Sequence, residues 1–153
     1  MLRIFFYISV CVSGLVTAAA FWTANQYIVV FDPQRELYGG GNGNPGSFMF
    51  VVFLPIIIYF LFSLIILFDS LYASLSRRLS SILTIVLFIA AGVIFTRMLL
   101  EAVKWRDYIN AYHPYMEVGL FSQFSNDIFF NGWTFSGLIF VMGVLGFLYG
   151  RVK

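Results

Sequence analysis

Apolar residues fall into four long stretches along the chain, separated by shorter segments that contain most of the charged and turn-forming residues. A membrane-spanning helix needs about 20 predominantly apolar residues. The pattern predicts helices over residues 4–31, 48–68, 79–104 and 128–149, joined by two loops, 32–47 and 105–127, and a tight turn over 69–78. We therefore expect an all-α membrane protein whose four transmembrane helices form an antiparallel bundle, a single domain over residues 1–153.

The first stretch begins like a secretory signal peptide. Arg3 precedes the apolar run, and the sequence Ala18-Ala19-Ala20 resembles a cleavage site. The apolar run nevertheless continues to Phe31, well past that site. We therefore predict a retained transmembrane helix.

The distribution of charge predicts the orientation of the chain in the membrane. Cytoplasmic segments of membrane proteins are enriched in Lys and Arg. If both termini are cytoplasmic, the short inner segments contain Arg3, Arg77, Arg78, Arg151 and Lys153. Every acidic residue except Asp69 then falls on the outer side. We expect cytoplasmic N- and C-termini, and we expect the plasma (inner) membrane to be the host membrane.

The composition agrees with a lipid environment. Hydrophobic residues make up 61% of the chain and charged residues only 10%, and the mean hydropathy is +0.91. Soluble domains carry about 25% charged residues. The net charge of +2 is too small and too scattered to indicate nucleic-acid binding. Cys11 is the single cysteine, which excludes an internal disulfide and a cysteine-based metal cluster.

Ionisable side chains are missing from the middle of every predicted span. Ion-coupled transporters, proton relays and voltage sensors place such groups there because those groups perform the function. His113 is the only histidine, whereas a zinc site needs three or four ligands. Because no pattern indicates catalytic, cofactor-binding or metal-binding residues, we predict that the protein is not an enzyme.

Small residues recur along one face of the last predicted helix. They are Gly132, Ser136, Gly143, Gly146 and Gly150. The last two form a Gly-x-x-x-Gly pair, and small residues of this kind let membrane helices approach closely. We predict that this face packs against the other helices of the bundle. The alternative is that it contacts another protein.

The outer end of the third predicted helix combines charged and aromatic residues. Arg97 and Glu101 are one helical turn apart, where side chains meet, and could form a local ion pair or bind a lipid headgroup or a partner. Four aromatic residues with polar tips follow: Trp105, Tyr108, Tyr112 and Tyr115. Trp and Tyr concentrate both at membrane interfaces and in binding hot spots. These six residues are the predicted outer docking surface.

The leading functional hypothesis is a non-catalytic accessory or structural subunit that packs against a larger integral membrane protein or complex. The absence of Asp, Glu, Lys, Arg and His from the middle of the spans, the small-residue face and the aromatic outer surface favour it. Two alternatives stay open: a membrane-embedded immunity protein that protects against a toxin, and a small oligomeric channel or transporter. A pore mouth would be lined by Thr17, Thr23, Asn25 and Gln26. The predicted partners are the lipid bilayer and a larger membrane protein, and a homo-oligomer is a further option.

Overall fold

The computed structural model describes residues 2–27, 44–112 and 118–152, and this part of the chain is helical apart from short turns. The helices are α1 (Leu2–Gln26), α2 (Pro45–Ser74), α3 (Arg77–Tyr112), α4 (Asn126–Phe129) and α5 (Gly132–Val152). Four segments are long and apolar enough to cross a membrane: α1, α2, α3, and α4 together with α5. The prediction of an all-α chain with four such helices is confirmed.

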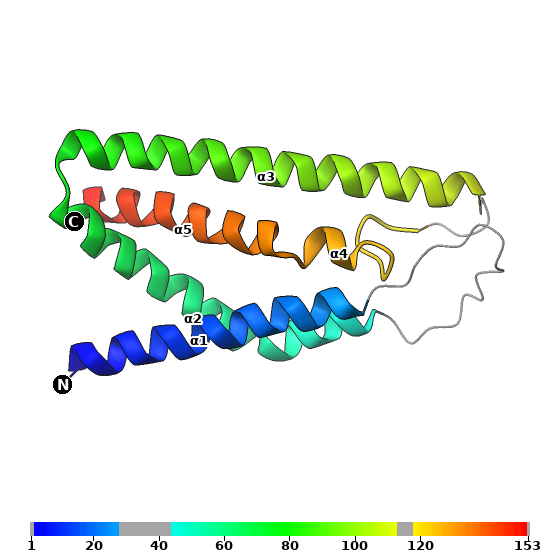
Figure 1. Cartoon of the computed structure of the whole chain (residues 1–153), viewed down its shortest axis with the longest axis horizontal. Coiled ribbons are helices and arrows are strands. Elements are labelled where there is room, and N and C mark those ends of the chain that lie inside the picture. The colour runs from blue at the N-terminus through cyan, green and yellow to red at the C-terminus, as the bar shows by residue number, and fades with distance from the viewer. Residues whose placement is uncertain (1, 28–43, 113–117, 153) are drawn as a thin grey trace.

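The long helices are arranged in a row. α1 packs against α2, α2 packs against α5, and α5 packs against α3, so that α5 lies between α2 and α3. Figure 1 places the start of α1, the end of α5 and the α2–α3 turn at one end of the molecule, called here the terminal end. The end of α1, the start of α2, the end of α3 and α4 lie at the opposite end, the loop end (Figure 1).

α2 and α3 are longer than their apolar runs predict. Asn44 caps α2, because its side-chain oxygen accepts hydrogen bonds from the backbone N–H groups of Gly46 and Ser47 at 3.0 and 3.3 Å. Such a cap, with proline in the first turn, is a favourable helix start. At the terminal end only residues 75 and 76 separate α2 from α3, where the sequence suggested a turn over 69–78.

The far end of α3 occupies part of the predicted loop 105–127. The helix continues to Tyr112 instead of ending at residue 104. Ala102 and Ile109 are both buried and lie seven residues apart, which is close to two helical turns. One side of the extended part of α3 is therefore packed within the molecule. Figure 1 shows that α3 reaches farther toward the loop end than α1 or α2.

The last apolar stretch, predicted as one helix over 128–149, contains a break. Asn131 lies between α4 and α5 and satisfies backbone groups of both. Its amide nitrogen donates to the carbonyl oxygens of Asp127 and Ile128 at 2.6 and 2.9 Å. Its side-chain oxygen accepts from the backbone N–H groups of Trp133 and Thr134 at 2.9 and 3.0 Å. One side chain therefore closes α4 and caps α5.

α2 bends along its length (Figure 1). Pro55 lies inside this helix, and a proline within a helix removes one backbone hydrogen bond and clashes with the preceding turn. Contacts with α1 occur on both sides of the proline, since the hydroxyls of Ser9 in α1 and Tyr59 in α2 are 2.6 Å apart, and the part after the proline also reaches α5. Phe50, before the proline, packs edge-on against Phe21 of α1, and Tyr72, after it, packs edge-on against Phe147 of α5. The bend therefore lets one helix contact both α1 and α5.

The interior of the molecule is small, and large apolar side chains cover much of its outside. A cluster of buried residues, Phe21, Ala24 and Phe130, lies toward the loop end. In the most apolar part of α3, only 11% of the residues are buried. This outward apolar surface is what a lipid environment accommodates.

Candidate functional site

Two glycines of the predicted small-residue face lie against α2. A Cβ atom added at Gly146 would be 2.5 Å from the Cβ of Phe68 and 2.9 Å from the carbonyl oxygen of Ile65. A Cβ atom added at Gly150 would be 2.5 Å from a carboxylate oxygen of Asp69. Gly146 therefore requires glycine, because the atoms that its Cβ would meet include backbone, whereas at Gly150 the end of the Asp69 side chain could turn aside. Both glycines lie against α2, so this part of the face is occupied within the molecule.

The other members of that face lie in different surroundings. A Cβ atom at Gly143 would be 2.6 Å from the Leu87 side chain of α3, whereas one at Gly132 would meet no atom within 4 Å. The Ser136 hydroxyl donates to the Gly132 carbonyl oxygen at 2.7 Å. Gly137, which the sequence pattern did not single out, is buried against α3, with Ile94 3.1 Å from an added Cβ.

A buried asparagine, Asn126, and a half-buried one, Asn44, join three segments at the loop end. The Asn126 side-chain nitrogen donates to the carbonyl oxygen of Tyr27 at 2.7 Å and to the side-chain oxygen of Asn44 at 2.8 Å. Asn44 donates back to the Asn126 side-chain oxygen at 2.6 Å. Asn126 is only 1% exposed, so these bonds replace its contacts with water. We call Asn44 and Asn126 the asparagine junction; it positions the ends of α1 and α2 against α4.

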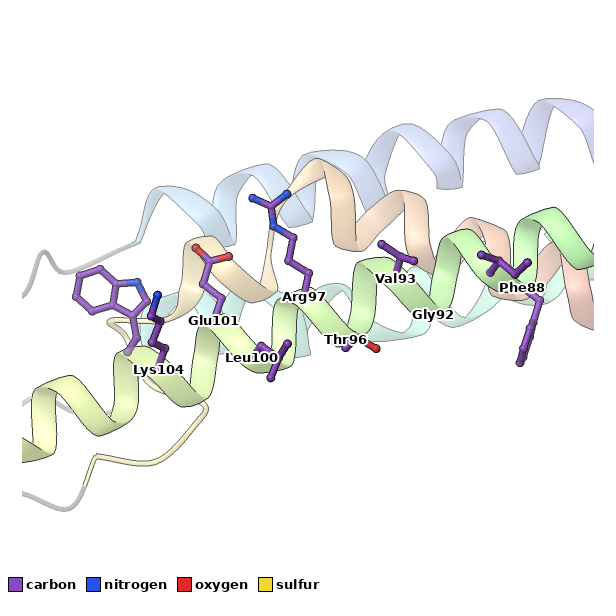
Figure 2. A pocket seen from close by; sticks show the side chains of 10 residues that line it. Phe88, Gly92, Val93, Thr96, Arg97, Leu100, Glu101 and Lys104 are labelled. Atoms are coloured by element: carbon purple, nitrogen blue, oxygen red, sulfur yellow. The ribbon is translucent and has the colours of Figure 1, made fainter.

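The outward face of α3 contains a hollow of about 800 Å³ (Figure 2). Two rows of residues at four-residue spacing line it: Phe88, Gly92, Thr96, Leu100 and Lys104 in one row, and Ile89, Val93, Arg97, Glu101 and Trp105 in the other. Side chains four residues apart form a ridge along a helix. The hollow is therefore a shallow groove between two ridges of one helix, and we call it the α3 groove.

A second hollow, of about 200 Å³, lies between α3 and the break that separates α4 from α5. Arg97 and Glu101 line it together with Asn131, Trp133 and Thr134, so these two charged residues border both hollows. Figure 2 shows the Arg97 and Glu101 side chains extending from the same side of α3.

Within residues 2–27, 44–112 and 118–152, no ion pair joins Arg97 to Glu101, although they are one turn apart on the same helix. The ion pair present on α3 is between the neighbouring residues Arg106 and Asp107, at 2.6 Å. Asp127 of α4, a second carboxylate, is close enough to Glu101 for the two charges to repel one another. The local ion pair that the spacing suggested for Arg97 is thus not formed.

Three aromatic members of the predicted docking surface form a ladder on the extension of α3. Trp105 and Tyr108 pack edge-on with ring centroids 5.7 Å apart, and the rings of Tyr108 and Tyr112 are 5.0 Å apart. Their exposed fractions are 41%, 43% and 55%. We call these three residues the aromatic ladder. Tyr115, predicted to belong to the same surface, lies outside the described residues.

The polar residues predicted at a pore mouth do not form one strip. Thr17 is fully buried, and its hydroxyl donates to the carbonyl oxygen of Ser13 on the same helix at 2.7 Å. Thr23 and Asn25 are half-buried, and Gln26 is exposed. In the described part of the chain, no group of three or more side chains is placed to hold a metal ion. His113 lies outside that part.

The chain matches no protein-family model, and it matches no curated protein and no solved structure. Function is therefore inferred from the site itself.

Proposed function

We propose that the protein is a non-catalytic accessory subunit of the plasma (inner) membrane that binds a larger integral membrane protein through the aromatic ladder. The observation that supports this proposal is the length of α3. At 1.5 Å per residue, its 36 residues extend about 54 Å, whereas the hydrocarbon core of a bilayer is about 30 Å thick. Much of the helix must therefore project beyond the lipid chains as a preformed rod.

In the proposed topology, the four long segments form an antiparallel bundle with the terminal end in the cytoplasm. Arg77 and Arg78 begin α3 at this end, directly after the short turn, and Arg151 lies in the last turn of α5. Positive charge in short segments favours the cytoplasmic side. The loop end, with the projecting part of α3, then faces outward.

The aromatic ladder extends beyond the depth at which interfacial aromatic residues are usual. Arg97 is about 30 Å along the helix from Arg77, which places it near the outer edge of the hydrocarbon core. Tyr112 lies about 22 Å farther along. The headgroup region adds only about 5–8 Å on each side of the core. Tyr112 therefore has a partner protein or water as its environment, and a rigid helix presents its ring at low entropic cost.

The accessory role is also compatible with the packing of α5. Gly146 and Gly150 contact α2, so the close-approach face of α5 stabilises the subunit itself, and the outer helices of the row, α1 and α3, stay available to a partner. The channel alternative loses one of its candidate lining residues, because Thr17 is fully buried and bonded within α1.

Purification of the tagged protein in a mild detergent tests the proposal. We expect a larger membrane protein to co-purify in stoichiometric amount with the wild type. Combined substitution Trp105→Ala, Tyr108→Ala and Tyr112→Ala should remove it, since each binding hot spot contributes at least about 2 kcal/mol, roughly a thirtyfold change in affinity.

The matched control replaces exposed aromatic residues outside the ladder, Tyr7→Ala, Trp22→Ala and Phe48→Ala. This variant should retain the partner. Recovery of the wild type as a lone monomer or homo-oligomer would contradict the accessory role.

A further inference from the structure

The α3 groove changes from apolar to charged along its length. Phe88, Ile89 and Val93 line the apolar half and are exposed. Gly92 lies between them, and a Cβ atom added there would meet no atom within 4 Å, so the floor of the groove is open. In a membrane, lipid acyl chains surround such a groove, and an acyl chain fits an open apolar groove along a helix.

The charged half follows in a fixed order. Arg97 is the next residue after Val93 in its row, and Glu101 follows one turn later, about 6 Å farther along the axis. Lys104 lies at the charged end of the other row (Figure 2). Trp105 ends the row that contains Glu101. Because Arg97 and Glu101 do not pair with each other, both charges border the groove without being neutralised by one another.

This order matches the order of groups in one kind of phospholipid headgroup. In a glycerophospholipid the phosphate lies next to the acyl chains, and the group esterified to it lies farther out. An arginine favours a phosphate because its guanidinium donates several hydrogen bonds in one plane. A carboxylate favours a primary ammonium, which donates three hydrogen bonds. Asp127 of α4 does not line the groove, but it is close enough to Glu101 for the two carboxylates to repel one another, which favours a positive charge beside Glu101.

We propose that the α3 groove binds a phospholipid with an ethanolamine headgroup, the phosphate on Arg97, the ammonium on Glu101 and one acyl chain along Gly92. Choline fits less well because its quaternary nitrogen has no N–H to donate to Glu101. A glycerol headgroup fits less well because it brings no positive charge to the carboxylate. The site belongs to the isolated subunit and is independent of the accessory role.

Native mass spectrometry of the full chain, stripped of lipid in detergent, tests this site. The probes are phosphatidylethanolamine, phosphatidylcholine and phosphatidylglycerol with identical oleoyl chains. We expect the wild type to bind the ethanolamine lipid about tenfold more tightly than either of the others, the effect of one charge-assisted hydrogen-bonded contact. Arg97→Gln should weaken all three lipids, and Glu101→Gln should reduce the ethanolamine lipid to the level of the choline lipid.

Two further variants separate the site from general effects of charge. Asp107→Asn removes a carboxylate of the same helix that is paired with Arg106 outside the groove, and it should leave the preference unchanged. Gly92→Leu fills the open floor without changing any charge, and it should weaken all three lipids.

Equal binding of the three lipids to the wild type would overturn the proposal. Persistence of the ethanolamine preference in Glu101→Gln, or full lipid binding by Gly92→Leu, would also overturn it.

Discussion

At the residue scale, Gly146 shows how closely two helices of this protein approach. An added Cβ atom would be 2.5 Å from the Cβ of Phe68, well inside contact distance, so α5 must move away from α2 to accept any side chain. We expect Gly146→Ala to lower the melting temperature in detergent, with a cost of about 1–3 kcal/mol as in other overpacked cores. Circular dichroism during heating measures the change.

Gly132→Ala is the matched control on the same helix. No atom lies within 4 Å of the added methyl group there, so we expect no loss of stability. If the two variants melted at the same temperature, the close approach of α5 to α2 at Gly146 would be contradicted.

The asparagine junction carries a second prediction at this scale. Asn126→Leu removes the hydrogen bonds to Tyr27 and Asn44 and leaves the part-buried carbonyl and amide groups of these residues without those partners. We expect a loss of about 1–3 kcal/mol in thermal unfolding, the usual cost of such groups. Asn25→Leu makes the same chemical change at a half-buried position of α1 and should cost less. A larger loss for Asn25→Leu would count against the junction.

Single residues were the part of the site hardest to predict from sequence. The recurrence of glycine on the last helix could be recognised in the sequence. Gly137 was nevertheless missed, and Gly132 has open space beside it. The buried role of Asn126 had no signal, because an asparagine near a helix end looks like an ordinary cap. Its function as a junction depends on Tyr27 and Asn44, far away in the sequence.

At the element scale, the extension of α3 beyond residue 104 is the feature most open to test. In a Cys11→Ser background, single cysteines placed along the extension can be labelled with a thiol reagent. Positions 105, 108 and 112 are exposed, whereas Ala102 and Ile109 are buried, so we expect fast labelling at the first three and slow labelling at the other two. Uniformly fast labelling from 102 to 112 would indicate a loop and refute the extension.

The apolar runs predicted the existence of the helices more accurately than the residues at which the helices end. A run of 20 apolar residues excludes most alternatives in a membrane. Helix ends depend instead on particular hydrogen bonds, such as those of Asn44 at the start of α2 and Asn131 at the break before α5. Because charged residues are interspersed with apolar ones beyond Thr96 in α3, hydropathy alone gave no clear end point for that helix.

At the scale of the whole molecule, the order of neighbours could not be read from the sequence. α5 lies between α2 and α3, although it is last in the chain. Lipid tails and apolar helices offer each other similar surfaces, so hydropathy does not distinguish a face that meets lipid from one that meets protein. The glycines of α5 were the clearest sequence signal of a helix with close neighbours.

The proposed orientation gives a prediction for the whole chain. Fusions of a reporter that is active only in the cytoplasm should be active at residue 1 and at residue 153, because the positive charges of the terminal end favour that side. Alkaline phosphatase is active only outside the cytoplasm. Fused after Tyr112, it should also be active. Activity of the phosphatase at either terminus would reverse the orientation.

Photocrosslinking in living cells tests most directly the central claim that the projecting end of α3 binds a larger membrane protein. A photoreactive phenylalanine analogue is placed at Tyr108 or Tyr112, with exposed Ile85, on the apolar part of the same helix, as the control. We predict one discrete product at 108 and 112 that contains this 17.4 kDa chain and a different, larger membrane protein, and none at 85. Absence of any product at 108 and 112, or a product containing only two copies of this chain, would contradict the claim.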